Sequence, residues 1–419
     1  MNICIAAPIA TADLAHLLQL PSDGFPAGYA GAPLTAVLIE ELLRLGHKVH
    51  ALTVDYARPP GSPVRQAGGQ ALTLEVLPGR RRAWRFVGGR PGRALDLFRD
   101  ERHALARAIR TAAPQVVHAH WTYEFALGAL DSGCPHVITA HDSPLQIVRY
   151  TRSPYRLLRW WMARAALREA QCVTAVSDYV AAQVQGMARV PVQLVPNPVS
   201  TQVLGQGWPR GAPAGKRIAM VCNGWDRRKN PEPGLLGFAQ WRAGNPTAEL
   251  HAFGADFGAG ESAQRWAQAH GVDAGVHFRG RMPHRELLDA LNLTDALLHP
   301  SLEESFGVVL AEAMGLGLPV VAGRHSGAAP SVLGGDEEGR SNCGVLTDVR
   351  SPSAIAAALT QLFDGKYAAR SSAGLARVRT AFSPATVAKA YETIYRQALQ
   401  AAAPAARLDA RAHADGVAP

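Results

Sequence analysis

The stretch His299–Val321, HPSLEESFGVVLAEAMGLGLPVV, decides the fold that this sequence predicts. The apolar run Ala296–Leu298 just before it has the character of a buried strand, which a Pro-Ser pair ends. Apolar residues at helical spacing follow in Val308–Met314, and two glycines then end the helix. Leu318–Val321 begins another buried strand. The stretch therefore predicts strand, loop, helix, turn and strand.

Two acidic residues lie at the start of this helix and in its body. Glu304 is near the N-terminus, where free N–H groups attract a carboxylate, so a simple helix cap is one interpretation. Glu312 follows eight residues later, roughly 12 Å along a helix. That is the distance from a ribose to the sugar beyond a pyrophosphate. Because carboxylates accept hydrogen bonds from hydroxyls, the pair is suited to hold both ends of a sugar nucleotide.

The same residues resemble a known family. Glu304-Ser-Phe-Gly and Glu312-Ala, preceded by Pro-Ser and followed by Gly-x-Pro-Val-Val, are similar to the E-x7-E signature of retaining glycosyltransferase family 4. The resemblance covers about residues 1–400 and is strongest from Val276 to Val321. It implies an α/β protein with the GT-B fold, in which two Rossmann-like parallel-sheet domains face each other across a cleft.

The composition is that of a globular two-domain protein. The chain has 419 residues, 47% hydrophobic and 18% charged, and the sequence has no apolar run long enough to span a bilayer. Its five cysteines are scattered without metal-ligand spacing, which favours buried thiols in a reducing compartment. The N-terminus is expected to be a first strand and not a signal peptide. The net charge of +9 favours anionic partners, but no motif indicates nucleic-acid binding.

The alternation of strands and helices predicts the domain boundaries. We expect an acceptor-side domain at 1–198 and a nucleotide-sugar-binding domain at 216–382, joined by a Gly- and Pro-rich linker. A helix at 383–400 is expected to cross back to the first domain, as the resemblance implies. The Ala-rich tail 401–419 is expected to be disordered.

Candidate site residues of the first domain follow the ends of predicted strands. Open α/β sheets bind ligands there, so the two histidine motifs His118-Ala-His120-Trp121 and His141-Asp142 are candidates for function, although a single histidine is usually structural. The resemblance implies that His141 faces the reacting sugar. Three further residues of these motifs are predicted to contact the acceptor: His120, Trp121 and Asp142. A long glycine-containing loop follows the first strand, and the resemblance assigns Gly31 to the donor phosphate.

Two basic stretches of the first domain contain aromatic residues and no acid. Arg80–Arg93 holds six arginines with Trp84 and Phe86, and either a solvated loop or a contact with lipid or another polyanion explains it. The second stretch, Arg149–Arg168, predicts a basic amphipathic helix after Pro154. Such a helix suits an anionic membrane surface, whereas the alternative packs its tryptophans into the core.

Candidate donor-binding residues follow the strands of the second domain. The segment after the strand at 218–222 resembles the place where the family grips the β-phosphate; Lys229 matches, and Arg228 or Arg227 replaces the usual arginine. The turn Arg279-Gly-Arg-Met resembles one that contacts the nucleobase. We therefore predict these donor-binding residues in the second domain: Arg227, Arg279, Met282, Ser305, Phe306, Gly307 and Glu312.

The expected chemistry needs fixed positive charge and no metal. Glycosyl transfer develops negative charge on the departing diphosphate, which Lys229, Arg228 and helix N–H groups are suited to stabilise. The sequence has no Asp-x-Asp motif, and we expect neither metal nor cofactor. The predicted catalytic residues are His141, Glu304, Lys229 and Arg228.

The resulting hypothesis is a retaining glycosyltransferase that moves a sugar from a nucleotide-sugar donor to a glycan or lipid-linked acceptor. The predicted location is cytoplasmic and peripheral at the inner face of the membrane, in polysaccharide biosynthesis. A sugar-nucleotide epimerase on the same fold is the alternative enzyme. A non-catalytic two-domain sugar binder is a third possibility, which the phosphate-gripping residues disfavour.

Overall fold

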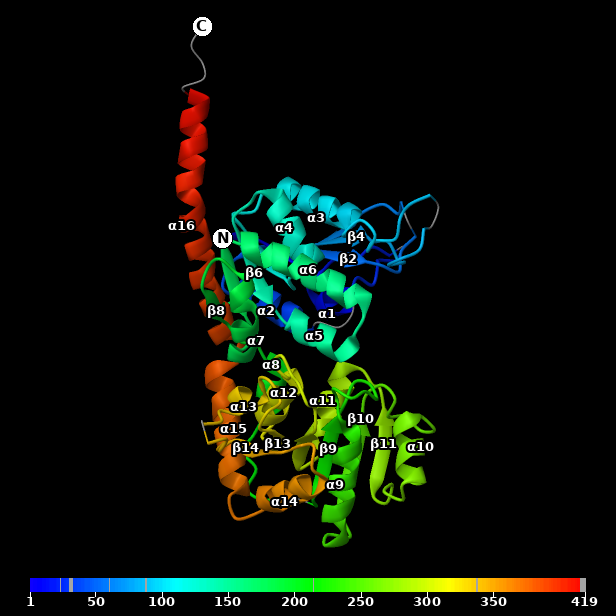
Figure 1. Cartoon of the computed structure of the whole chain (residues 1–419). Coiled ribbons are helices and arrows are strands. Elements are labelled where there is room, and N and C mark those ends of the chain that lie inside the picture. Colours follow the sequence, from blue (N-terminus) through cyan, green and yellow to red (C-terminus); the bar gives the residue numbers. More distant parts are fainter. Residues whose placement is uncertain are drawn as a thin grey trace. The chain divides into compact units, whose positions relative to one another are not determined.

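The computed structural model describes residues 1–22, 24–29, 33–59, 61–86, 89–213, 215–336 and 338–414, with side chains described through residue 402 (Figure 1). The chain forms two compact units. Unit 1 comprises Met1–Val176, Val180–Val195 and the chain from Val387 onward, and unit 2 comprises Ser177–Tyr179 and Pro196–Thr386. Both units are α/β, as the sequence predicts.

Unit 1 is built on an eight-stranded sheet in the order β3-β4-β2-β1-β5-β6-β7-β8. All neighbouring strands are parallel except β3, which runs antiparallel to β4 at the edge. Because helices cover a parallel sheet on both faces, the sequences of its strands are nearly continuous apolar runs. The strands are β1 Asn2–Ala6, β2 Lys48–Asp55, β3 Arg65–Gly68, β4 Leu72–Pro78, β5 Val116–His120, β6 His136–Ala140, β7 Cys172–Ala175 and β8 Val192–Leu194.

The helices of unit 1 include the last helix of the chain. Val387, Tyr391, Ile394 and Tyr395 of α16 are buried in one cluster with strand residues such as Ile3. The alternation of these apolar residues with polar ones gives α16 one face suited to the core. The helices are α1 Thr11–Leu14, α2 Pro33–Arg44, α3 Arg99–Ala112, α4 Glu124–Ser132, α5 Pro144–Thr151, α6 Pro154–Glu169, α7 Asp178–Val184 and α16 Pro384–Ala414.

Unit 2 is built on a six-stranded, fully parallel sheet in the order β11-β10-β9-β12-β13-β14. Its strands are β9 Arg217–Val221, β10 Glu249–Phe253, β11 Val276–Gly280, β12 Ala296–His299, β13 Val320–Gly323 and β14 Gly344–Thr347. Its helices are α8 Thr201–Gln206, α9 Pro231–Ala243, α10 Ser262–Ala269, α11 His284–Asn292, α12 Val308–Gly315, α13 Ala329–Val332, α14 Pro352–Leu362 and α15 Tyr367–Ala381. The strand order reverses between β9 and β12, so a ligand-binding crevice is expected at their carboxyl ends.

Some local predictions were wrong. The irregular linker expected between the domains instead belongs to unit 2 and contains α8, whose first turn is capped by the Ser200 hydroxyl. The helix predicted after Pro154 in the basic stretch 149–168 is present as α6, and the residues before it end the separate helix α5. The chain past residue 400, expected to be disordered, continues α16 to Ala414 because alanine favours helix. The described helices include none long and apolar enough to cross a membrane.

Candidate active site

Two loops, which follow β9 and β12, meet where the strand order of unit 2 reverses. Lys229 lies after β9 and Glu304 after β12, and Lys229 Nζ is 2.6 Å from Glu304 Oε1. The two side chains are only 13% and 11% exposed. Arg228 also contacts the second loop, with Nη1 3.4 Å from the carbonyl oxygen of Glu303. The fold thus brings together three residues that the sequence predicts for the site.

Glu304 has a second partner that the sequence analysis missed. His299, the last residue of β12, lies with Nε2 3.0 Å from the same oxygen, Glu304 Oε1. Burial by itself raises the pKa of Glu304, but the hydrogen bond with His299 and the charge of Lys229 outweigh it, so that pKa lies well below its usual value. Glu304 therefore keeps its negative charge at neutral pH. The position of His299 at a strand end, like that of His120, was the signal that could have found it.

Helix α12 begins later than the spacing argument assumed. Its first residue is Val308, and no side chain caps its N-terminus, so Glu304 lies in the preceding loop and is not a helix cap. The estimate of 12 Å along one continuous helix was therefore wrong. Gly307 turns the chain into the helix with φ of +79°, which glycine adopts without steric cost. Phe306 is buried, and the Ser305 carbonyl oxygen accepts a hydrogen bond from the Ser177 hydroxyl at 2.6 Å.

A second glycine fixes the backbone of Glu304. Gly327 has φ of +60°, and a Cβ atom there would lie 2.4 Å from the Glu304 carbonyl oxygen. That oxygen accepts a hydrogen bond from the backbone N–H of Ala328 at 2.8 Å. Only glycine allows the two loops to approach this closely, so Gly327 positions the Glu304 loop.

A cavity of about 620 Å³ opens at the carboxyl ends of β9, β10 and β11. Its lining includes Met282, a predicted donor-binding residue, together with Arg281. Arg279, a predicted donor-binding residue, is exposed and lies on β11. His284, at the start of α11, also lines the cavity, and its Nε2 is 2.6 Å from Oε1 of the buried Glu312. His284 is thus a second histidine that the sequence analysis missed.

The histidines of unit 1 form a buried chain at the ends of β5 and β6. His120 Nδ1 lies 2.8 Å from His141 Nε2, and the ring of Trp121 stacks on His141 at 4.6 Å. His118, with its ring 4.1 Å from that of His120, contacts Tyr395 and Thr139 through its two nitrogens. Burial lowers the pKa of His141 to about 3, and burial with the nearby His141 lowers that of His118 to about 3. These imidazoles are therefore neutral at physiological pH.

A small cavity of about 120 Å³ lies beside this histidine chain. Trp121 and Asp142 line it, as do Tyr123 and Arg159. The Tyr123 hydroxyl donates to Asp142 at 2.9 Å, and Arg159 lies over the Tyr123 ring at 3.8 Å while pairing with Glu124 at 2.8 Å. The structure brings together His120, His141 and Trp121, with Asp142 on the adjacent wall. Gly31 lies outside the described residues, and Arg227 is exposed.

Comparison with known proteins assigns each half of the chain to a family model. Residues 34–203 match Glycosyltransferase Family 4, and residues 208–374 match Glycosyl transferases group 1. The D-inositol 3-phosphate glycosyltransferase of Corynebacterium diphtheriae is 30% identical over 195 residues, which are 45% of this chain and 44% of the relative. The glycogen synthase of Mycobacterium tuberculosis is 35% identical over 144 residues, 33% of each chain. These matches span less than half the length of the curated relatives.

Solved structures match over nearly the whole chain. Sucrose-phosphate synthase from Thermosynechococcus elongatus has a TM-score of 0.71 at 20% identity, covering 96% of this chain and 100% of that one. Anabaena HepE in complex with UDP has a TM-score of 0.62 at 18% identity, covering 94% and 99%. At such identities the likeness establishes the fold, which is GT-B. Since the two family models match consecutive halves of a chain with this fold, it belongs to the family 4 type of glycosyltransferases.

Proposed function

We propose that this chain transfers a sugar from a nucleotide-sugar donor to a glycan or lipid-linked acceptor, with retention of anomeric configuration and without a metal. The observation that carries the proposal is the buried Lys229–Glu304 pair at the switch point of unit 2. A charged pair in a ligand-binding crevice is costly to bury and is suited to a charged ligand that can replace one partner. The neighbouring cavity has room for a nucleotide.

The donor diphosphate competes with Glu304 for the ammonium group of Lys229. When the phosphate takes Lys229, the Glu304 carboxylate is released to accept hydrogen bonds from the hydroxyls of the donor sugar. His299 keeps the carboxylate oriented during this exchange, since it contacts the same oxygen. Lys229 then faces the diphosphate oxygens on which negative charge grows as the bond between the sugar and the diphosphate breaks. Such electrostatic stabilisation of the transition state is usually the largest single contribution to catalysis.

The ribose of the donor and the acceptor are proposed to bind to the cavity wall of unit 2 and to the histidine chain of unit 1, respectively. Glu312, oriented by His284, is proposed to accept hydrogen bonds from the ribose hydroxyls. In unit 1, the neutral His141 and His120 and the cavity beside Asp142 are proposed to hold the acceptor side. A neutral imidazole at His141 does not repel the positive charge that develops on the sugar.

Glu312→Ala tests the donor site. Because the ribose contact is retained from ground state to transition state, we expect donor KM to rise more than kcat falls. Glu312→Gln, which keeps a hydrogen-bond acceptor, is the matched control and is expected to lose less. An unchanged donor KM in the alanine variant would contradict this role.

Product analysis tests the reaction itself. Incubation with UDP-, GDP- and ADP-sugars and an acceptor is expected to give a glycoside with the donor's anomeric configuration, observed by NMR. An epimerised free sugar formed without acceptor would instead identify the alternative enzyme class. Turnover is expected to persist in EDTA, and a strict requirement for Mg²⁺ would contradict the metal-free reaction.

A second proposal concerns where the enzyme works. We infer that unit 1 binds an anionic membrane surface, because its two basic stretches meet on the same surface: the Trp84 ring lies 6.3 Å from the ring of Tyr155 on α6. Trp84, Phe86 and Trp161 are 47%, 69% and 56% exposed. Exposed aromatic rings among arginines suit the headgroup region of a bilayer. Arg80 and Arg159 do not contribute, since acidic side chains neutralise both.

Liposome flotation tests the surface. Replacing the exposed Arg81, Arg82 and Arg85 by glutamine is expected to lower partitioning onto anionic vesicles about 10²-fold at low salt, from roughly 1 kcal/mol per residue. Wild-type binding is expected to fall with added salt. The matched control removes three exposed arginines of unit 2, Arg265, Arg285 and Arg350. Equally negligible binding of the wild type to neutral and anionic vesicles would show that unit 1 does not bind an anionic membrane.

A further inference from the structure

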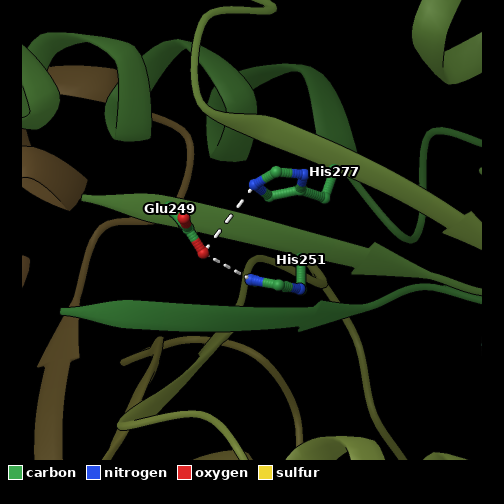
Figure 2. A group of neighbouring side chains, drawn as sticks. All are labelled: Glu249, His251 and His277. Atoms are coloured by element: carbon green, nitrogen blue, oxygen red, sulfur yellow. Dashed lines mark hydrogen bonds and ion pairs between the residues drawn. The ribbon is translucent and has the colours of Figure 1, made fainter. Parts of the chain in front are cut away.

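Two histidines and a glutamate gather at the edge of the unit 2 sheet, away from the proposed donor site. Glu249 and His251 are two residues apart on β10, so both side chains point to the same face, opposite to Leu250 and Ala252 in the core. His277 on the edge strand β11 is the register partner of His251 and reaches the same face. Figure 2 shows the Glu249 carboxylate beside the two imidazole rings, with one oxygen directed toward a nitrogen of each.

The three ligand atoms are spaced as a metal site requires. Glu249 Oε2 lies 3.1 Å from His251 Nε2 and 3.7 Å from His277 Nε2, and all three atoms lie within 4.8 Å of one another. Zinc bonds of about 2.0–2.1 Å at tetrahedral angles separate neighbouring ligand atoms by about 3.3 Å. Small side-chain rotations therefore suffice to close the site around an ion.

The cluster has the chemistry and the access of an open zinc site. Two imidazole nitrogens and one carboxylate are borderline-soft donors that suit zinc better than calcium or magnesium. Glu249 and His277 are each 42% exposed and His251 is 15% exposed, so an ion can enter and a water can complete the coordination.

We propose that Glu249, His251 and His277 bind a zinc ion that ties the edge strand β11 to β10. The site is distinct from the donor cavity, because its ligands lie on the strands and the cavity residues Gly254 and Met282 lie after them. Binding to the folded state alone stabilises unit 2 by mass action. Since β11 leads directly into the turn that lines the cavity, the ion also stiffens one cavity wall.

Arg279 gives the proposal a specific test. Its Nη2 lies 3.4 Å from His251 Nδ1, the ring nitrogen that must carry the proton when Nε2 binds the metal. The guanidinium has no acceptor atom, so it must move aside on metal binding. In Arg279→Gln, the amide oxygen can accept the Nδ1 proton and one positive charge beside the ion is removed. This variant is therefore expected to bind zinc more tightly than the wild type.

Titration of the untagged, metal-stripped full chain with zinc tests the site by calorimetry. We expect one ion per chain, visible four-coordinate absorption bands with Co²⁺ in its place, and a rise in Tm of about 5–10 °C at a hundredfold excess over Kd. His277→Gln and Glu249→Gln are expected to abolish these signals. Replacing the exposed His325, far from the cluster in sequence, is the matched control and is expected to leave them unchanged.

Two outcomes would overturn the proposal: no binding of zinc or Co²⁺, or binding that persists in both cluster variants. Either result would make the cluster an ordinary ion pair between a glutamate and two histidines. Because the readouts are binding, absorption and Tm, they are independent of glycosyl transfer. An unchanged donor KM in Glu312→Ala would count against the proposed function, but it would not bear on the zinc site.

Discussion

At the scale of single residues, the charge of Glu304 governs the candidate active site. Its carboxylate has both Lys229 and His299 within hydrogen-bond distance, and it is nearly buried. Burial raises the pKa of a carboxyl group, but the hydrogen bond with His299 and the charge of Lys229 outweigh this and keep Glu304 ionised. Glu304 in turn holds the Lys229 ammonium group in place, with Nζ 2.6 Å from Oε1.

Lys229→Ala is expected to lower kcat about 10²–10³-fold, because one electrostatic contact is lost where charge develops in the transition state. It also leaves Glu304 with one partner, and breaking a buried pair costs about 3–5 kcal/mol. Steady-state kinetics and urea unfolding measure the two effects separately.

The double variant Lys229→Met with Glu304→Gln separates catalysis from folding. With no charge left unpaired, its stability is expected to recover while its activity stays low. Full activity in Lys229→Ala would move the phosphate contact to another cation, of which Arg227 is the exposed neighbour in the same loop.

At the scale of elements, the loops after parallel strands position the site, and glycines set their paths. The β12–α12 loop holds Glu304, and the loop after β13 presses against it through Gly327. No side chain caps the N-terminus of α12, and the backbone N–H of Leu310 in its first turn donates to the Gly307 carbonyl oxygen at 2.9 Å. A change in either loop is therefore expected to alter kcat, because it moves the Glu304 carboxylate.

Gly327→Ala is expected to reduce both stability and kcat. The added methyl group would lie 2.4 Å from a backbone oxygen of Glu304, and the left-handed conformation costs a further 1–2 kcal/mol, roughly, for alanine. Gly339→Ala is the matched control, since Gly339 has φ of +73° with no atom near its Cβ position. Unfolding midpoints and kcat check the pair. Equal losses in the two variants would show that the contact with Glu304 is unimportant.

At the scale of the whole molecule, the two units titrate differently. Unit 1 encloses histidines that are neutral when folded, whereas unit 2 encloses a carboxylate that is charged when folded. A histidine with a depressed pKa takes up protons mainly in the unfolded state, so its stability contribution is complete above about pH 6.5 and is lost as pH falls toward 3. A glutamate with a depressed pKa contributes fully above its usual value of 4.5 and loses that contribution only below it.

Unit 1 is therefore expected to weaken first when the chain is acidified. Between pH 6.5 and 4.5 each buried histidine lowers the stability of unit 1 by up to about 1.4 kcal/mol per pH unit. Hydrogen exchange measured by mass spectrometry resolves the two units, and peptides of β5 and β6 are expected to lose protection before those of β9 and β12. His118→Gln is expected to flatten this dependence. Simultaneous loss of protection in both units at pH 4 would contradict the assignment.

The sequence by itself determined the fold class, the order of strands and helices, and the loops that carry the site. Local periodicity and the Pro and Gly residues encode these features, so the stretch around Glu304 was sufficient to predict strand, loop, helix and strand. Only the tertiary structure decided which side chains meet. The pairs Lys229–Glu304, His284–Glu312 and His120–His141 join residues far apart in sequence, and packing of loops sets their contacts. The Glu249–His251–His277 cluster arises in the same way, because strand register aligns His251 with His277, and register depends on sheet pairing that no local pattern records.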